Sequence, residues 1–150
     1  MINIEVDLAI IGGGPAGQKG AIQGAKSDKR VAIVDRLGVM GGASLNQGTI
    51  PSKTLRSAIL DLTGYQQSKY YGHTQKTVEE ISVEDLTERI NKVIHDESSD
   101  LEEQCKRNGI DLVYGQARFA NSHTLEVLNG QGAMTHCIIA EKILIASGSR

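Results

Sequence analysis

Three glycines near the N-terminus have the spacing of a dinucleotide-binding turn. They are Gly12, Gly14 and Gly17, and Asp35 follows 18 residues after the last of them. Gly12 would allow a tight turn, Gly14 would let the backbone reach a pyrophosphate, and Gly17 would let a helix approach a strand. The N-terminus of that helix would offer unpaired N–H groups to the phosphates, and Asp35 would accept a ribose hydroxyl. The pattern therefore predicts a dinucleotide site.

The elements around this turn form one βαβ unit. Residues 6–11 are apolar nearly throughout, which is typical of a strand buried on both faces. A helix is expected over residues 15–27, with Pro15 in its first turn. Residues 31–35 are a second apolar strand that ends in Asp35. Strand, helix and strand follow one another within about 30 residues, so the two strands should be parallel.

Residues 37–52 carry no charge and contain four of the chain's 17 glycines. Because a surface linker is normally hydrated, this segment is expected to be a partly buried loop pressed against something large. A helix should follow over residues 52–62. Together with the turn at residues 12–17, the uncharged loop favours FAD over NAD. A nicotinamide dehydrogenase would also need a catalytic His or Tyr downstream, and the sequence offers no convincing candidate.

The second half of the chain completes an α/β pattern. Ser82 can cap a helix of about 26 residues that ends before Gly109. Short strands are expected over residues 110–113, 117–119, 124–128, 134–139 and 142–146, and the turn signal Asn129-Gly130 predicts a hairpin. The predicted fold is Rossmann-like: a parallel sheet, a helical layer, and an antiparallel three-stranded meander on the opposite face. Residues 63–81 predict no element.

Composition excludes several classes of function. The chain has 150 residues, a formal charge of −2, five aromatic residues and no Trp, which disfavours a nucleic-acid binder. The N-terminus is a poor signal peptide, and no run approaches the roughly 20 apolar residues of a membrane helix. Cys105 and Cys137 are 32 positions apart, which favours two buried thiols over a disulfide or a metal site. We therefore expect a cytoplasmic protein without a bound metal.

Two motifs resemble the class I pyridine nucleotide–disulfide oxidoreductases. They are GGGPAG at residues 12–17 and GTIPSK at residues 48–53, and residues 115–119, 123–125 and 140–150 are also similar to the family. The resemblance covers essentially the whole chain and implies the FAD-binding domain. It implies FAD contacts for these residues: Gly12, Gly14, Pro15, Ala16, Gly17, Asp35, Arg36, Gly42, Ser44, Gly48, Thr49, Lys53, Gly115, Ala117, Ala146, Ser147 and Gly148.

Lys53 would be the catalytic residue of this set. By resemblance it lies near N5 and O4 of the flavin, where its charge would favour reduced flavin. Gly115 and Ala117 would pass beneath the adenine. The residues themselves allow a plainer interpretation as well, since a lysine on a helix is usually solvated and residues 115–117 follow a strand end.

The chain departs from the family's disulfide-reducing members at two positions. Ser44 and Thr49 occupy the places of the two redox cysteines, and hydroxyls cannot form a disulfide. The resemblance therefore favours the soluble Si-specific transhydrogenase branch, which moves hydride between NADPH and NAD+ through FAD without this dithiol. Ser44 departs even from that branch. A dihydrolipoamide dehydrogenase-like reductase with a diverged dithiol and a non-catalytic FAD-binding module remain alternatives.

The same resemblance implies an incomplete enzyme. Residues 1–150 would be the first segment of a discontinuous FAD-binding domain, with the NAD(P)-binding and dimerisation domains absent from this chain. The complete protein is expected to use NAD(P)H as a substrate and to form a homodimer, with no nucleic-acid or membrane partner. The 150-residue chain alone should be inactive and should hold FAD weakly or not at all.

Overall fold

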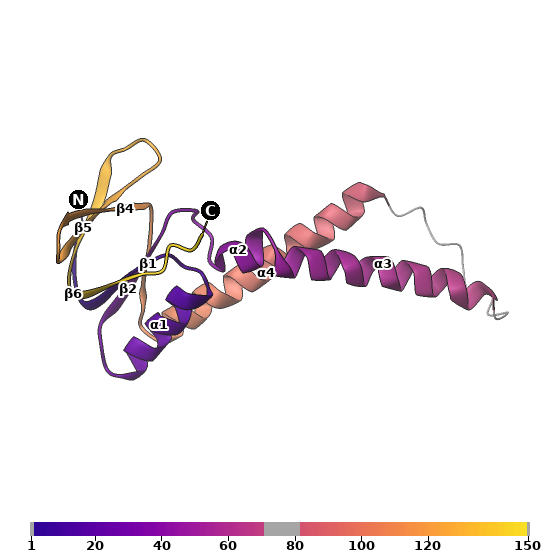
Figure 1. The fold of residues 1–150 in the computed structure, drawn as a ribbon, viewed down its shortest axis with the longest axis horizontal. Coiled ribbons are helices and arrows are strands. Elements are labelled where there is room, and N and C mark those ends of the chain that lie inside the picture. The colour runs from indigo at the N-terminus through magenta and orange to yellow at the C-terminus, as the bar shows by residue number, and fades with distance from the viewer. Residues whose placement is uncertain (1, 71–81, 150) are drawn as a thin grey trace.

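The structure describes residues 2–70 and 82–149, and a six-stranded sheet lies at one end of this part of the chain (Figure 1). In this computed structural model, side chains are described for residues 2–61 and 82–149. The strand order is β3-β2-β1-β6-β5-β4. The strands are β1 (Ile2–Ile11), β2 (Val31–Asp35), β3 (Asp111–Tyr114), β4 (Gln116–Asn121), β5 (Thr124–Leu128) and β6 (Met134–Ile145). The pairs β3–β2, β2–β1 and β1–β6 are parallel, and β6–β5 and β5–β4 are antiparallel.

The parallel strands confirm the βαβ unit predicted from the sequence. Successive residues of β2 alternate between two apolar clusters: Ala32 and Val34 face one, and Val31 and Ile33 face the other. All five residues of β2 are buried, as expected for a central strand with both faces covered. β1 begins four residues earlier than predicted, because residues 2–5 pair with the first part of β6.

One sequence prediction about the strands was wrong. Residues 134–139 and 142–146 were expected to be two strands, but β6 is continuous from Met134 to Ile145. Ala140 bridges the two parts, since it is buried and its N–H donates to the carbonyl of His123 at 2.9 Å. The meander of β4, β5 and β6 therefore belongs to the same sheet as the parallel strands and is not a separate layer.

The predicted packing of the meander on the opposite face holds nonetheless. Leu125, Val127 and Ile138 from the meander are fully buried in one cluster with Ala9 and Val34 of the parallel strands. The other cluster joins the sheet to the helices through residues such as Ile10, Ala21 and Cys105. The sheet therefore buries apolar side chains on both of its faces.

Four helices occupy the described residues: α1 (Pro15–Lys26), α2 (Gly42–Asn46), α3 (Thr49–Tyr70) and α4 (Val83–Arg107). The prediction of one loop over residues 37–52 was wrong, since α2 lies inside it and α3 begins at Thr49. The helix expected over residues 52–62 is longer at both ends, and it includes part of the stretch for which no element was predicted. The rest of that stretch, residues 71–81, lies outside the described residues. None of the described helices is long and apolar enough to cross a membrane.

α4 begins and ends where the sequence indicates. Ser82 and Asp85 form a capping box at its start, and Gly109 follows its C-cap with a φ of +67°. The C-terminal part of α4 covers the sheet, where Leu101 and Cys105 join the helix-side cluster. Its N-terminal part extends beyond the sheet and packs against α3, so the two helices project as a long pair (Figure 1). The expectation of a helix covering a sheet therefore holds for only part of α4.

Candidate dinucleotide-binding site

The turn between β1 and α1 has the close packing that its glycines predict. Gly12 donates its N–H to the carbonyl of Val34 at 2.8 Å, which ties the turn to β2. Gly17 is buried, and a Cβ at this position would overlap the carbonyl oxygen of Gly12. Gly14 is the N-cap of α1 and has no side chain with which to cap it. The helix therefore lies directly against the turn, and its first N–H groups are left for a ligand or water.

Gly13 lies between Gly12 and Gly14, and both its N–H and its carbonyl form hydrogen bonds. Its N–H donates to Oδ2 of Asp35 at 2.7 Å. Its carbonyl accepts the side-chain amide of Gln18 at 2.7 Å and the backbone N–H of Gly41 at 3.0 Å. Groups from α1, from β2 and from the segment after β2, residues 36–42, therefore fix the backbone of Gly13.

Asp35 lies at the end of β2, as predicted, but it has a structural task that the sequence did not reveal. Its Oδ2 accepts a hydrogen bond from the N–H of Gly13, and its Oδ1 accepts one from the N–H of Leu37 at 2.8 Å. The residue is only 8% exposed. A carboxylate has about four lone-pair positions, so a ribose hydroxyl can still be accepted. Arg36, the next residue, is exposed.

The segment after β2 is hydrogen-bonded to α4, which is distant in sequence. The N–H of Met40 donates to Oγ of Ser98 at 3.1 Å, and both residues are buried. Gly42, at the start of α2, has a φ of +58°, and a Cβ there would lie 2.8 Å from Cα of Gly14. The segment is therefore packed against the fingerprint turn, in line with the predicted partial burial. Its exposed residues, Leu37 and Val39, do not fit that prediction.

Gln18 and Ser98 were missed by the sequence analysis. Each is a polar residue on the otherwise apolar or small-residue face of its helix. Ser98 lies four residues after Ile94 and three before Leu101, inside the buried stripe of α4. A polar residue at such a position was the available signal for a buried hydrogen bond.

The residues that follow in the motif lie on α2 and α3. Ser44 donates its hydroxyl to the carbonyl of Gly41 at 3.0 Å, which is a local bond at the start of α2. Gly48 separates the two helices, and Thr49 is the exposed first residue of α3. Lys53 is exposed on the second turn of α3. Its expected place beside a flavin stays a prediction.

The remaining predicted residues divide into two groups. Gly115 donates its N–H to the carbonyl of Asp35 at 2.9 Å, and Ala146 donates to that of Ile11 at 2.8 Å, so both lie at the carboxyl ends of the parallel strands. Ser147 and Gly148 follow Ala146 and are exposed. Ala117, by contrast, is on β4 and packs against the core between the parallel strands and the meander. Its expected contact with adenine is therefore not tested by this arrangement.

Two titratable groups near the helix-side cluster have raised pKa values. Burial raises the pKa of the Cys105 thiol, and the Glu102 carboxylate adds to the effect. Burial also raises the pKa of the Tyr114 phenol, whose hydroxyl donates to Oε1 of Glu102 at 2.7 Å. Cys105 on α4 and Cys137 on β6 are free thiols, but only Cys105 is buried, so the expectation of two buried thiols was wrong for Cys137. The raised pKa makes Cys105 a poor nucleophile.

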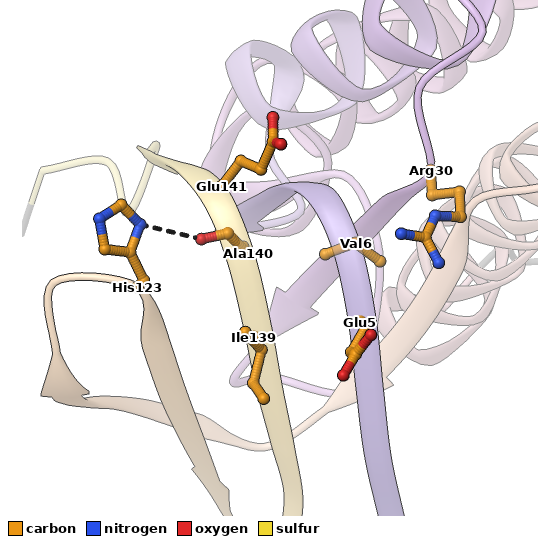
Figure 2. Close-up of a pocket in the computed structure, with 7 residues that line it drawn as sticks. All are labelled: Glu5, Val6, Arg30, His123, Ile139, Ala140 and Glu141. Carbon is orange, nitrogen blue, oxygen red and sulfur yellow. Dashed lines mark hydrogen bonds between the residues drawn. The ribbon is translucent and has the colours of Figure 1, made fainter.

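A groove of about 430 Å³ lies beside the middle of β1 and β6 (Figure 2). Val6, Ile139 and Ala140 form part of its lining, and His123 points its Nδ1 toward the carbonyl of Ala140 at 3.1 Å. Arg30 immediately precedes β2, so the groove lies near the amino end of that strand. Ligands of open parallel sheets bind at the carboxyl ends. The turn at residues 12–17 is therefore the better candidate site.

The family model for pyridine nucleotide-disulphide oxidoreductases matches residues 6–150. The chain belongs to this family. Its α/β fold is accordingly the Rossmann-like fold of a known group of oxidoreductases.

Curated relatives and solved structures cover nearly all of this chain. A soluble pyridine nucleotide transhydrogenase of Mycobacterium tuberculosis (strain ATCC 25177 / H37Ra) is 42% identical over 146 residues, which are 97% of this chain and 31% of that protein. One from Colwellia psychrerythraea is 33% identical over 99% of this chain and 31% of its own length. The Cu(II) complex of HOCl-induced flavoprotein disulfide reductase RclA from Escherichia coli aligns with a TM-score of 0.74 and 30% identity over 97% of this chain and 29% of that one. The chain thus spans about a third of these proteins.

Proposed function

We propose that this chain is the FAD-binding part of a flavoprotein that transfers hydride between NADPH and NAD+. The observation that carries the proposal is the uncapped N-terminus of α1, packed against the Gly12–Gly17 turn at the carboxyl ends of the strands. Backbone N–H groups and the partial positive charge of the helix suit a pyrophosphate there. The names of the curated transhydrogenase relatives support the type of reaction.

The residues present fit an FAD molecule. The glycine backbone leaves space where side chains would stand in the way, and Asp35 at the end of β2 keeps lone pairs for the adenosine ribose. Lys53 and Arg36 are exposed cations that can approach the flavin and the phosphates, respectively. The remaining expected contacts at residues 42–49, 115–117 and 146–148 belong to the same proposal.

Bound FAD would supply the ring that accepts and gives up hydride. The chain's own part is to bind and orient the cofactor. The turn at residues 12–17 would hold the pyrophosphate, Asp35 would hold the adenosine half, and Lys53 would supply a positive charge for the flavin. Ser44 and Thr49 carry hydroxyls that cannot take electrons in place of a dithiol. Electrons would therefore pass between flavin and nucleotides only.

The domain organisation and partners are also proposals. Residues 1–150 would be the first segment of the FAD-binding domain, and the NAD(P)-binding and dimerisation domains would come from the rest of a homodimeric cytoplasmic enzyme. On this view the 150-residue chain alone shows no turnover, because it lacks the NAD(P)-binding domain to which the nucleotide substrate would bind. Hydride transfer by residues 1–150 alone would contradict this organisation.

The test is an assay of the complete protein with two substrates. It is purified, its absorption spectrum is recorded for flavin, and it is titrated separately with FAD and NAD. We expect retained FAD, transhydrogenation from NADPH to an NAD+ analogue, and no reduction of lipoamide. Tight NAD binding without flavin would refute the proposal. Lipoamide reduction would favour the dihydrolipoamide dehydrogenase-like alternative, and bound FAD without turnover would favour the non-catalytic module.

A further inference from the structure

Gln18 is a buried polar side chain beside the proposed pyrophosphate site. It is 8% exposed on the inner face of α1, between the buried residues Gly17 and Ala21. Its side-chain amide donates to the carbonyl of Gly13 at 2.7 Å. Burying an amide costs free energy unless it is bonded, and an apolar side chain would fill the same place without that cost. The amide of Gln18 is therefore expected to have a specific role at this position.

Satisfying the Gly13 carbonyl does not by itself explain this amide. The same carbonyl already accepts the backbone N–H of Gly41 at 3.0 Å. With that bond alone the buried acceptor would have a partner. The second bond from Gln18 makes the direction of the carbonyl much harder to change, because a rotation would now break two hydrogen bonds.

The direction of that carbonyl fixes the neighbouring N–H. The peptide between Gly13 and Gly14 is planar and trans, so its carbonyl and its N–H point in opposite directions. Because the carbonyl points inward to Gln18 and Gly41, the N–H of Gly14 points away from them. A peptide between two glycines rotates easily, and the opposite orientation would present a carbonyl oxygen where a phosphate must bind.

We propose that Gln18 is a positioning residue that holds the Gly13–Gly14 peptide with its N–H toward the pyrophosphate of a bound dinucleotide. The inference rests on the proposed function, since it assumes that FAD binds at this turn. Gln18 would act only through Gly13 and would not touch the cofactor. Its loss should therefore weaken contacts with phosphate while leaving contacts with the adenosine half unchanged.

The experiment compares Gln18→Met with a matched control in the complete protein. Methionine has a similar length and no amide, so it removes the bond and leaves little empty space. Gln23→Met makes the same change at an exposed position of the same helix. The apoproteins are titrated with FAD, ADP and adenosine, because ADP carries the pyrophosphate and adenosine does not.

We expect Gln18→Met to weaken FAD and ADP binding by about five- to tenfold, as for the loss of one hydrogen bond, and to leave adenosine binding unchanged. Gln23→Met should match the wild type for all three ligands. Unchanged FAD binding in Gln18→Met would overturn the inference. An equal loss for ADP and adenosine would also overturn it, because it would indicate general damage to the site.

Failure of the proposed function has a different signature, since neither the wild type nor Gln23→Met would bind FAD. If Gln18→Met does not fold, Gln18→Asn replaces it in the same comparison. Asparagine keeps the amide but is one methylene too short to reach the carbonyl of Gly13. The same selective loss of FAD and ADP is expected, and wild-type affinities would again overturn the inference.

Discussion

Replacing Gly42 by alanine should loosen the contact between the segment after β2 and the fingerprint turn. Gly42 has a φ of +58°, and its added Cβ would lie 2.8 Å from Cα of Gly14. Backbone atoms stand on both sides of this contact, so no side-chain rotation can relieve it. The start of α2 or the turn must move by several tenths of an ångström, which would disturb the proposed pyrophosphate site.

Two costs contribute, and a control separates them. A left-handed conformation costs a residue other than glycine about 1–2 kcal/mol, and an overpacked contact adds about 1–3 kcal/mol. Gly38 lies in the same segment with a φ of +70°, and a Cβ there would meet nothing within 4 Å. Gly38→Ala should therefore show the conformational cost alone, while Gly42→Ala should show both.

The assay is thermal denaturation followed by circular dichroism, together with FAD titration of the complete protein. The extra cost of about 1–3 kcal/mol should give Gly42→Ala a lower Tm than Gly38→Ala. FAD affinity should fall only in Gly42→Ala. Equal Tm values and equal FAD affinities for the two variants would refute the proposed contact between this segment and the turn.

Three further outcomes are expected. Hydrogen bonds from the backbone and the hydroxyl of Ser82 lower the pKa of Asp85 below its ordinary value of 3.8. The ionised cap therefore stabilises the fold above that pH, and this stabilisation is lost as the pH falls through the lower folded-state pKa. Denaturant titrations should show Asp85→Ala less stable than wild type at neutral pH and equal to it in strong acid, whereas a pH-independent difference would contradict this. Cys137 should react with a thiol reagent faster than Cys105, which is 1% exposed and has a raised pKa; equal rates would show that α4 opens readily. An anaerobic dithionite titration of the complete protein should consume two electrons per flavin, and four would reveal a redox dithiol elsewhere.

The local elements of the site could be predicted because short-range patterns specify them. The apolar runs that form β1 and β2 and the glycine spacing around Gly12 are visible in the sequence and need no distant partner. β5 was predicted with its observed bounds because turn residues stand at both ends of an alternating segment. In each case the neighbouring residues alone favour one local structure.

The errors arose where tertiary contacts decide the structure. Nothing in residues 134–146 shows that β6 continues through Ala140, since its partners on β1 are more than 130 residues away in sequence. The bond from Met40 to Ser98 spans 58 residues, and the bond from Gly13 to Asp35 spans 22. Such buried hydrogen bonds need the folded arrangement before their partners can be named.

The central claim is that this chain binds FAD for direct hydride exchange between two nicotinamide nucleotides. The most direct measurement follows flavin absorption in the complete protein under anaerobic conditions, with NADPH added first and NAD+ second. We predict that NADPH bleaches the flavin band, that NAD+ restores it with formation of NADH, and that thiol reagents change neither step. A flavin that NADPH does not bleach, or whose reoxidation by NAD+ is abolished by thiol modification, would contradict the account.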